Sequence, residues 1–219
     1  ADVELLDGTR TTVHCPNTGA MLGCAEPGSR VWLSISTNKT RKYPLGLEVV
    51  ETRSGALVGV NPMKANHLFR DAFTGGRIAG LESFDTLGAE VAAADGRSRL
   101  DFVLTNERTG EDCMVEVKSV TARDDRGFAF FPDAVSIRAI RHLESLASQS
   151  AGGSRAVLFF CIQRNDVVAV RPATEIHPEY AEALASAQSS GVEILAYRCT
   201  VSPDRIAVEN EVDVVVDVV

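Results

Sequence analysis

The sequence predicts a chain of mixed α+β class, in which an N-terminal all-β part precedes a mixed α/β part. Two observations support this division. Residues 1–61 hold short β-prone runs separated by turn signals, whereas residues from 62 onward alternate helical and apolar strand patterns. Regularly spaced short strands are typical of a small barrel or sandwich. Strands that alternate with helices are typical of a mixed sheet with helices on its faces.

In the N-terminal part, alternating or β-branched runs predict strands at residues 12–14, 30–37, 45–52 and 57–60. Turn-forming residues separate them at Asp7-Gly8, Asn17-Thr18-Gly19, Pro27-Gly28 and Ser54-Gly55. From residue 62 the sequence pattern changes from strand-like to helical. Pro62 is suited to open a helix that Gly75-Gly76 would end.

The second part continues with a short strand expected near residues 89–93. A hairpin follows, with strands 100–105 and 113–120 joined by the turn 106–112, and then a connecting loop at residues 121–131. Ser136 is a good N-cap for the next helix, which Gly152-Gly153 would stop. The remaining expected elements are strands at residues 155–163, 167–170 and 192–197, and a helix from Pro178 through Ala187.

The hairpin carries the most informative residues of the chain. Glu116 and Lys118 are two positions apart on one strand, so their side chains project from the same face. Pairing with the preceding strand would bring Asp101 beside Glu116. Two carboxylates supply hard oxygen ligands for Mg²⁺, and a lysine can orient water or offset charge in phosphodiester cleavage.

This spacing is similar to the D…ExK signature of the restriction-endonuclease-like superfamily. An edge hairpin with ordinary exposed charges is the alternative, since Glu and Lys alternate on many strands. The apolar neighbours Met114, Val115 and Val117 predict a buried strand. Buried charges are costly unless they are paired or bound to a metal.

Composition limits the classes of protein that remain. A length of 219 residues suits one large domain or two small ones, and the net charge of −8 does not indicate a generally basic nucleic-acid binder. The five cysteines are scattered without C-x-x-C spacing, as expected for reduced thiols. There is no membrane-spanning run and no signal peptide at residues 1–20, so we expect a cytoplasmic protein with no membrane partner.

Several segments together resemble one family: HCPNTGAM (14–21), TRKY (40–43), VGVN (58–61), SRLDF (98–102), VEVKSVT (115–121), FPDAVSIR (131–138), HLESL (142–146) and VLFFCIQR (157–164). They are similar to the sugar fermentation stimulation protein family, SfsA. The resemblance implies an N-terminal OB-like β-barrel, residues 1–66, followed by a restriction-endonuclease-like domain with a mixed central sheet, residues 67–219. The family's usual strand before Asp7-Gly8 has no match, so we expect either that the barrel lacks its first strand or that the given sequence starts late.

The resemblance also implies a site. Asp101 and Glu116 would hold Mg²⁺ or Mn²⁺, Lys118 would act on the transition state, and Glu90 would be an additional acid. The implied partner is DNA. The candidate nucleic-acid contacts are Asn17, Arg41, Lys42, Arg99, Arg138 and Arg141.

Each of these contacts has an ordinary structural reading as a turn or a solvated face. Three functions therefore remain open: a metal-dependent nuclease, a non-catalytic DNA-binding regulator of sugar (maltose) metabolism, and a protein-interaction scaffold. A homodimer also stays open.

Overall fold

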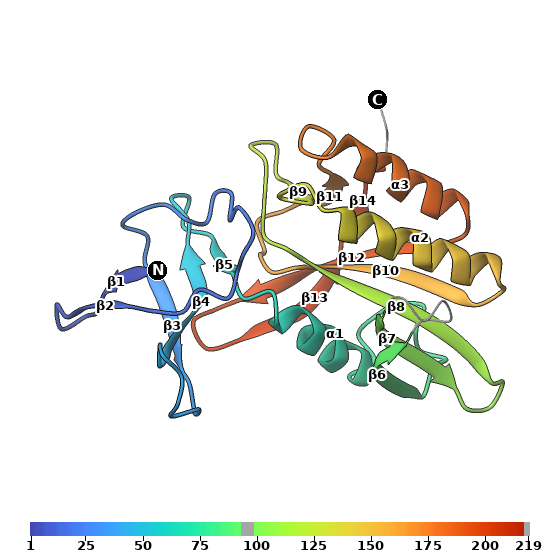
Figure 1. Ribbon diagram of the computed structural model, residues 1–219, viewed down its shortest axis with the longest axis horizontal. Helices are drawn as coiled ribbons and strands as arrows, with labels where there is room; N and C mark the ends of the chain where they lie inside the picture. Colours follow the sequence, from blue (N-terminus) through green and yellow to red (C-terminus); the bar gives the residue numbers. More distant parts are fainter. Residues whose placement is uncertain (93–98, 217–219) are drawn as a thin grey trace.

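The N-terminal part consists of short strands with a small core of their own (Figure 1). The structure is a computed structural model that describes residues 1–92 and 99–216. Strands β3 (Val31–Ile35), β4 (Leu45–Glu51) and β5 (Leu57–Gly59) form an antiparallel sheet. Its inner side packs apolar side chains from strands and loops, which are Val13, Cys24, Leu47, Val50, Val58 and Val60.

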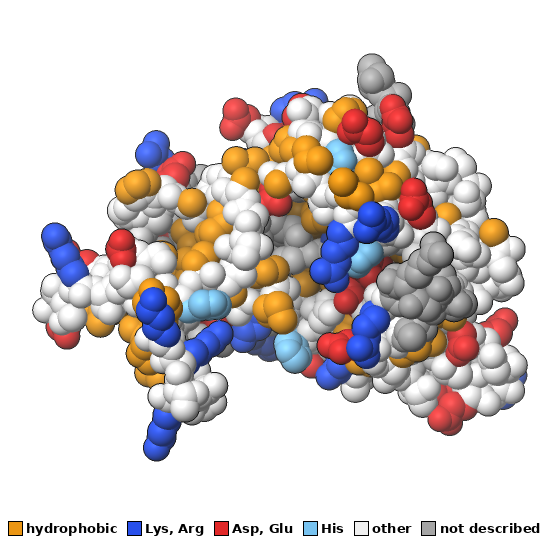
Figure 2. Space-filling view, viewed as in Figure 1, with side chains coloured by type: hydrophobic (Ala, Val, Ile, Leu, Met, Phe, Trp, Pro, Cys, Tyr) orange, Lys and Arg blue, Asp and Glu red, His pale blue; other side chains and the backbone are white. Residues whose placement is uncertain are grey.

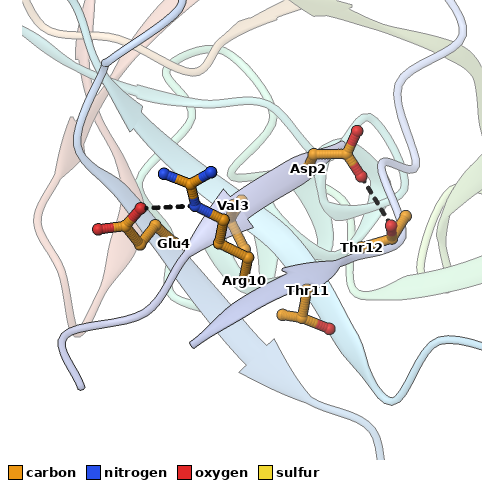
Figure 3. A pocket seen from close by; sticks show the side chains of 6 residues that line it. All are labelled: Asp2, Val3, Glu4, Arg10, Thr11 and Thr12. Atoms are coloured by element: carbon orange, nitrogen blue, oxygen red, sulfur yellow. Dashed lines mark hydrogen bonds and ion pairs between the residues drawn. The ribbon is translucent and has the colours of Figure 1, made fainter. Parts of the chain in front are cut away.

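A separate hairpin of β1 (Asp2–Glu4) and β2 (Arg10–Thr12) precedes this sheet. Figure 3 shows its two cross-strand side-chain pairs: Arg10 Nε donates to Glu4 Oε2 at 3.0 Å, and Thr12 Oγ1 donates to Asp2 Oδ1 at 2.6 Å. The six residues of the two strands line an open cavity of about 490 Å³. A strand therefore does precede the Asp7-Gly8 turn, although it is too short to show an alternating pattern in the sequence.

The second part is built around a six-stranded mixed sheet with the order β13-β12-β10-β8-β7-β6. Strands β8 (Glu111–Val120), β10 (Arg155–Ile162) and β12 (Glu193–Val201) are parallel and lie at its centre. Strands β6 (Thr86–Ala92), β7 (Arg99–Asn106) and β13 (Ile206–Glu211) add antiparallel edges. Because both faces of the central strands are covered, β10 is buried from Ala156 onward.

Helices cover the two faces of this sheet unequally (Figure 1). Helix α1 (Lys64–Thr74) packs on one face, where Phe69 stacks on Phe102 and meets the ring of Phe159 edge-on. Helices α2 (Ile137–Ala151) and α3 (Pro178–Ser189) pack on the other, around Leu143 and Leu146. Ser136 caps α2 as predicted, since its hydroxyl accepts a hydrogen bond from the Ala139 N–H.

Several boundaries differ from the prediction. The expected loop at residues 121–131 contains β9 (Phe128–Phe131), which pairs in parallel with β11 (Ala169–Pro172), itself two residues later than predicted. A small sheet with the order β14-β11-β9 results, in which β14 is Asp213–Val214. Neither β13 nor β14 was predicted. Strand β6 begins at residue 86 rather than 89, and residue 93 lies outside the described part of the chain. The strands of the small sheet form because distant segments pair with one another, which local patterns do not reveal.

The two parts of the molecule share a hydrogen-bonded seam. Gly59 N donates to Gln163 O at 2.8 Å, and Val58 forms an antiparallel bridge with Arg164. Gln163 Nε2 donates to Asn61 O at 3.1 Å and to Ser119 Oγ at 2.9 Å. Strand β5 is thereby joined to the end of β10. The predicted domain boundary at residue 66 falls inside α1.

Candidate active site

Asp101 and Glu116 meet where the pairing of β7 with β8 ends. The last paired residues are Phe102 and Val115, so Asp101 is the next position opposite Glu116. At this position the Asp101 side chain, not its backbone, bonds to β8: Oδ2 accepts a hydrogen bond from Val117 N at 2.9 Å. Asn66 on α1 donates to Oδ1 at 3.0 Å and fixes the second oxygen. The predicted juxtaposition of the two acids is therefore present.

Lys118 and Glu116 form a buried ion pair, as expected from their shared face. The Lys118 Nζ lies 2.5 Å from Glu116 Oε1, and the two side chains are only 11% and 4% exposed. Burial of both charges requires close compensation. The edge-hairpin alternative with solvated charges does not describe these two residues.

His142, from α2, is a further member of this cluster. Its Nδ1 contacts Glu116 Oε1 and lies 3.0 Å from Lys118 Nζ. Arg138 Nε donates to His142 Nε2 at 3.2 Å, so that nitrogen is the acceptor and the ring proton is on Nδ1, facing Glu116. Sequence reasoning did not find this contact, because residues 116 and 142 lie on different elements.

The environment moves the pKa values of the two acids in opposite directions. Burial raises the pKa of Asp101, and the negative charge of Glu116 raises it further. Burial also acts to raise the pKa of Glu116, but the hydrogen bond from His142 and the charge of Lys118 outweigh it and lower that pKa. The site thus holds a firmly ionised Glu116 beside an Asp101 whose negative charge is under-compensated.

This donor set fits a divalent cation. The buried carboxylate of Glu116 and the partly buried one of Asp101 lie side by side, and a cation between them would relieve the repulsion that, after burial, raises the pKa of Asp101. Within residues 1–92 and 99–216, no three Asp, Glu, His or Cys side chains gather as a closed metal cage. Mg²⁺ keeps several waters and commonly takes only one or two protein carboxylates, so Asp101 and Glu116 suffice.

Glu90 lies opposite Asp101 in the pairing of β6 with β7, but its side chain pairs with Arg99. It falls between the pairs Ala89–Phe102 and Val91–Leu100, opposite Asp101. Its backbone is left-handed, with φ of +52°, and its Oε2 lies 3.7 Å from Arg99 Nη2. Both side chains are exposed, so Glu90 and Arg99 form a surface pair at the rim of the site.

The other predicted contacts lie in three separate places. Arg138 and Arg141 project from the exposed side of α2, and Figure 2 shows basic, acidic and histidine side chains adjoining there at the centre of the face. Arg41 and Lys42 are exposed in the loop between β3 and β4, away from α2 (Figure 1). Asn17 lies in the N-terminal loop, where its Oδ1 accepts a hydrogen bond from Gly19 N at 2.8 Å.

The fold and the site define a two-domain protein: an N-terminal OB domain followed by an α/β domain whose mixed sheet carries an acidic pair and a lysine. Family models agree with this. One described as "SfsA N-terminal OB domain" matches residues 1–60, and one described as "Sugar fermentation stimulation protein RE domain" matches residues 63–205. The chain therefore belongs to the sugar fermentation stimulation protein family.

Individual relatives support the assignment. A homologue from Halorhodospira halophila is 49% identical over 90% of this chain and 83% of its own length. One from Shewanella sp. (strain MR-4) is 47% identical over 94% and 87%. A solved structure of Pyrococcus furiosus SfsA in complex with Ca²⁺ is 25% identical, with a TM-score of 0.82 over 94% of this chain and 85% of that one. The described residues of our chain contain no helix long and apolar enough to cross a bilayer.

Proposed function

We propose that this protein binds DNA and cleaves its phosphodiester bonds with Mg²⁺ or Mn²⁺, at the site formed by Asp101, Glu116 and Lys118. The observation that carries the proposal is the buried Glu116–Lys118 pair directly beside Asp101. A buried charge cluster beside an acid with a raised pKa is typical of functional sites. The Ca²⁺ in the Pyrococcus furiosus relative supports a divalent cation in this family.

The residues of the chain would share the work as follows. Asp101 and Glu116 would hold the cation, which would supply Lewis acidity and a polarised water. Val117 N–H and Asn66 fix the Asp101 carboxylate, and His142 fixes Glu116, so neither acid needs to reorganise. The Lys118 ammonium would orient the attacking water or offset charge on the phosphoryl oxygens.

A cleavage assay tests this proposal. Single- and double-stranded DNA and RNA are incubated with Mg²⁺ or Mn²⁺ and wild type, Asp101→Ala or Lys118→Ala, with binding recorded in the same tubes. We expect metal-dependent cutting that falls at least about 100-fold in both variants, as is usual when one transition-state group is removed. Asp204→Ala, which changes an exposed acid outside the site, is the control and keeps full activity.

A non-catalytic DNA-binding regulator of sugar (maltose) metabolism is the second candidate. The observation that favours it is that Lys118 and His142 both engage the same oxygen, Glu116 Oε1, as a purely structural buried ion pair would. DNA binding without cutting, unchanged by Asp101→Ala and Lys118→Ala, would select this function and contradict the nuclease.

A further inference from the structure

A cavity of about 320 Å³ lies between the two domains, next to the candidate active site. Its walls come from three segments and one proline, which are residues 17–19, 119–122 and 130–136 and Pro62. The first segment belongs to the OB domain and the other two to the α/β domain. A volume near 300 Å³ with mixed polar and apolar walls is suited to a small ring-shaped group.

The cavity adjoins β8, the strand that carries Glu116 and Lys118. Ser119 and Val120 line it, and they directly follow Lys118 on β8. At about 3.3 Å per residue, the cavity wall starts within ~7 Å of the lysine. A nucleic-acid strand with its scissile phosphate at Lys118 would therefore place a neighbouring nucleotide at the cavity.

The charge of the cavity favours a base rather than a phosphate. Asp133 lines it, and its carboxylate rests against the OB-domain loop: a Cβ added to Gly19 would lie 2.3 Å from Asp133 Oδ2. Only glycine leaves room for this contact. A carboxylate accepts hydrogen bonds but repels phosphate oxygens, so the group that enters must present N–H donors.

Apolar side chains at the rim would help to separate bases. Val135 lines the cavity and is 68% exposed, and Met63, next to Pro62, is 72% exposed. Proteins that unstack nucleic acid insert such side chains between successive bases.

We propose that this cavity receives the base of an unpaired nucleotide adjacent to the scissile phosphate, and that Asp133 makes it prefer guanine. Guanine presents two adjacent donors, N1–H and the N2 amino group, which match the two oxygens of a carboxylate. Adenine, cytosine and thymine each offer fewer donors on that edge. The proposal rests on the proposed function, because it names the substrate of that site as single-stranded or frayed nucleic acid.

The test measures binding without cleavage, with EDTA present. Fluorescent single-stranded octanucleotides carry one guanine in an oligothymidine background, or an abasic site at the same position. We expect wild type to bind the guanine probe about tenfold more tightly than the abasic or all-thymidine probes, as for a bidentate base contact. Asp133→Asn should remove most of this preference, and Gly19→Ala should do the same by displacing Asp133.

Asp125→Asn is the matched control, because Asp125 is an exposed acid that does not line the cavity. It should keep the tenfold preference. Circular dichroism and melting temperatures verify that each variant is folded, and Asp133→Asn nearly preserves side-chain shape if Gly19→Ala does not fold.

The outcomes separate the two proposals. Equal affinity for all probes, or a preference unchanged by Asp133→Asn, overturns the base cavity and leaves the nuclease standing. A guanine preference that depends on Asp133, without metal-dependent cutting in the separate assay, supports the cavity and contradicts the nuclease. Failure to bind any of these oligonucleotides overturns the base cavity, and the nuclease is then decided by the separate cleavage assay with metal.

Discussion

His142 links helix α2 to the acidic pair through one ring. Its Nδ1 faces Glu116, and its Nε2 accepts from Arg138, a side chain on the molecular surface. An exposed arginine thereby sets the tautomer of a half-buried histidine, and that histidine orients a buried carboxylate. Groups that orient metal-binding carboxylates in this manner tune the affinity of the ion.

We predict that His142→Ala weakens divalent-metal binding by about 10- to 100-fold, the usual cost of removing such a support. His142→Gln, which keeps an N–H donor, should recover part of the affinity. Calorimetric titration with Ca²⁺ or Mn²⁺ measures this. Glu144→Ala, an exposed change on the same helix, is the control. Equal metal affinity in wild type and His142→Ala would contradict a positioning role.

At the scale of the element, helix α2 has one side that packs on the sheet and one exposed side that carries basic residues. Ala139, Leu143 and Leu146 are buried against the sheet, whereas Arg138 and Arg141 lie on the exposed side. The helical period alone produces this division. The exposed arginines lie beside the acidic pair, where a phosphate backbone approaching the site would pass.

We predict that Arg138→Gln with Arg141→Gln lowers DNA affinity and reduces the slope of log Kd against log salt by about 2, because each lost phosphate contact releases one counterion fewer. Fluorescence anisotropy over a range of NaCl concentrations gives the slope. Arg108→Gln, in the distant β7–β8 turn, should leave it unchanged. A slope unaffected by the double change would remove α2 from the DNA interface.

The seam between β5 and β10 supports a second prediction at this scale. A Cβ on Gly59 would lie 2.7 Å from Ile206 Cδ1 and 2.9 Å from Gln163 Oε1. Gly59→Ala should therefore overpack the seam and lower the free energy of unfolding by about 1–3 kcal/mol. Urea denaturation measures this cost. Gly88→Ala, whose Cβ would meet only ordinary contacts at 3.5 Å or more, is the matched control and should cost clearly less.

At the scale of the whole molecule, Arg164 forms a buried ion pair at the junction of the two domains. It donates to both Asp166 oxygens, at 2.6 and 2.8 Å, and to Thr121 O at 2.7 Å. Its backbone bridges to Val58, and the Cys24 thiol also reaches Thr121 O. The guanidinium is 4% exposed, so losing its partner would leave a buried charge.

This pair predicts a pH dependence of stability. Burial acts to raise the pKa of Asp166, but the hydrogen bonds and charge of Arg164 outweigh it and lower that pKa. A lowered folded-state pKa stabilises the fold above the ordinary value of 3.8, and this contribution is lost as the pH falls through the lower folded-state value.

Asp166→Asn should therefore cost on the order of 2 kcal/mol at pH 7, less than for a fully buried pair because Asp166 is 24% exposed. Melting temperatures of wild type and variant should converge as the pH drops below 4. Exposed Asp125→Asn serves as control and should follow wild type at every pH. A difference that stays constant with pH would contradict the ionic origin.

The sequence by itself determined the order and kind of most elements, because their period, caps and turns are local. Ser136 and the glycines after α1 and α2 fixed the helix ends, and alternation on β8 placed Glu116 with Lys118. The Asp101–Glu116 pairing was predictable from one short hairpin, whose two strands are joined by a single turn.

Only the tertiary structure decided what depends on contacts between distant segments. His142 contacts Glu116 because α2 packs on β8. The separation of residues 116 and 142 along the chain does not predict this contact. Strands β9 and β14 pair with β11, which lies about 40 residues away from each of them along the chain. The seam at Gln163 and the cavity at Asp133 arise where the two domains meet, since a three-dimensional surface brings together residues that no local pattern relates.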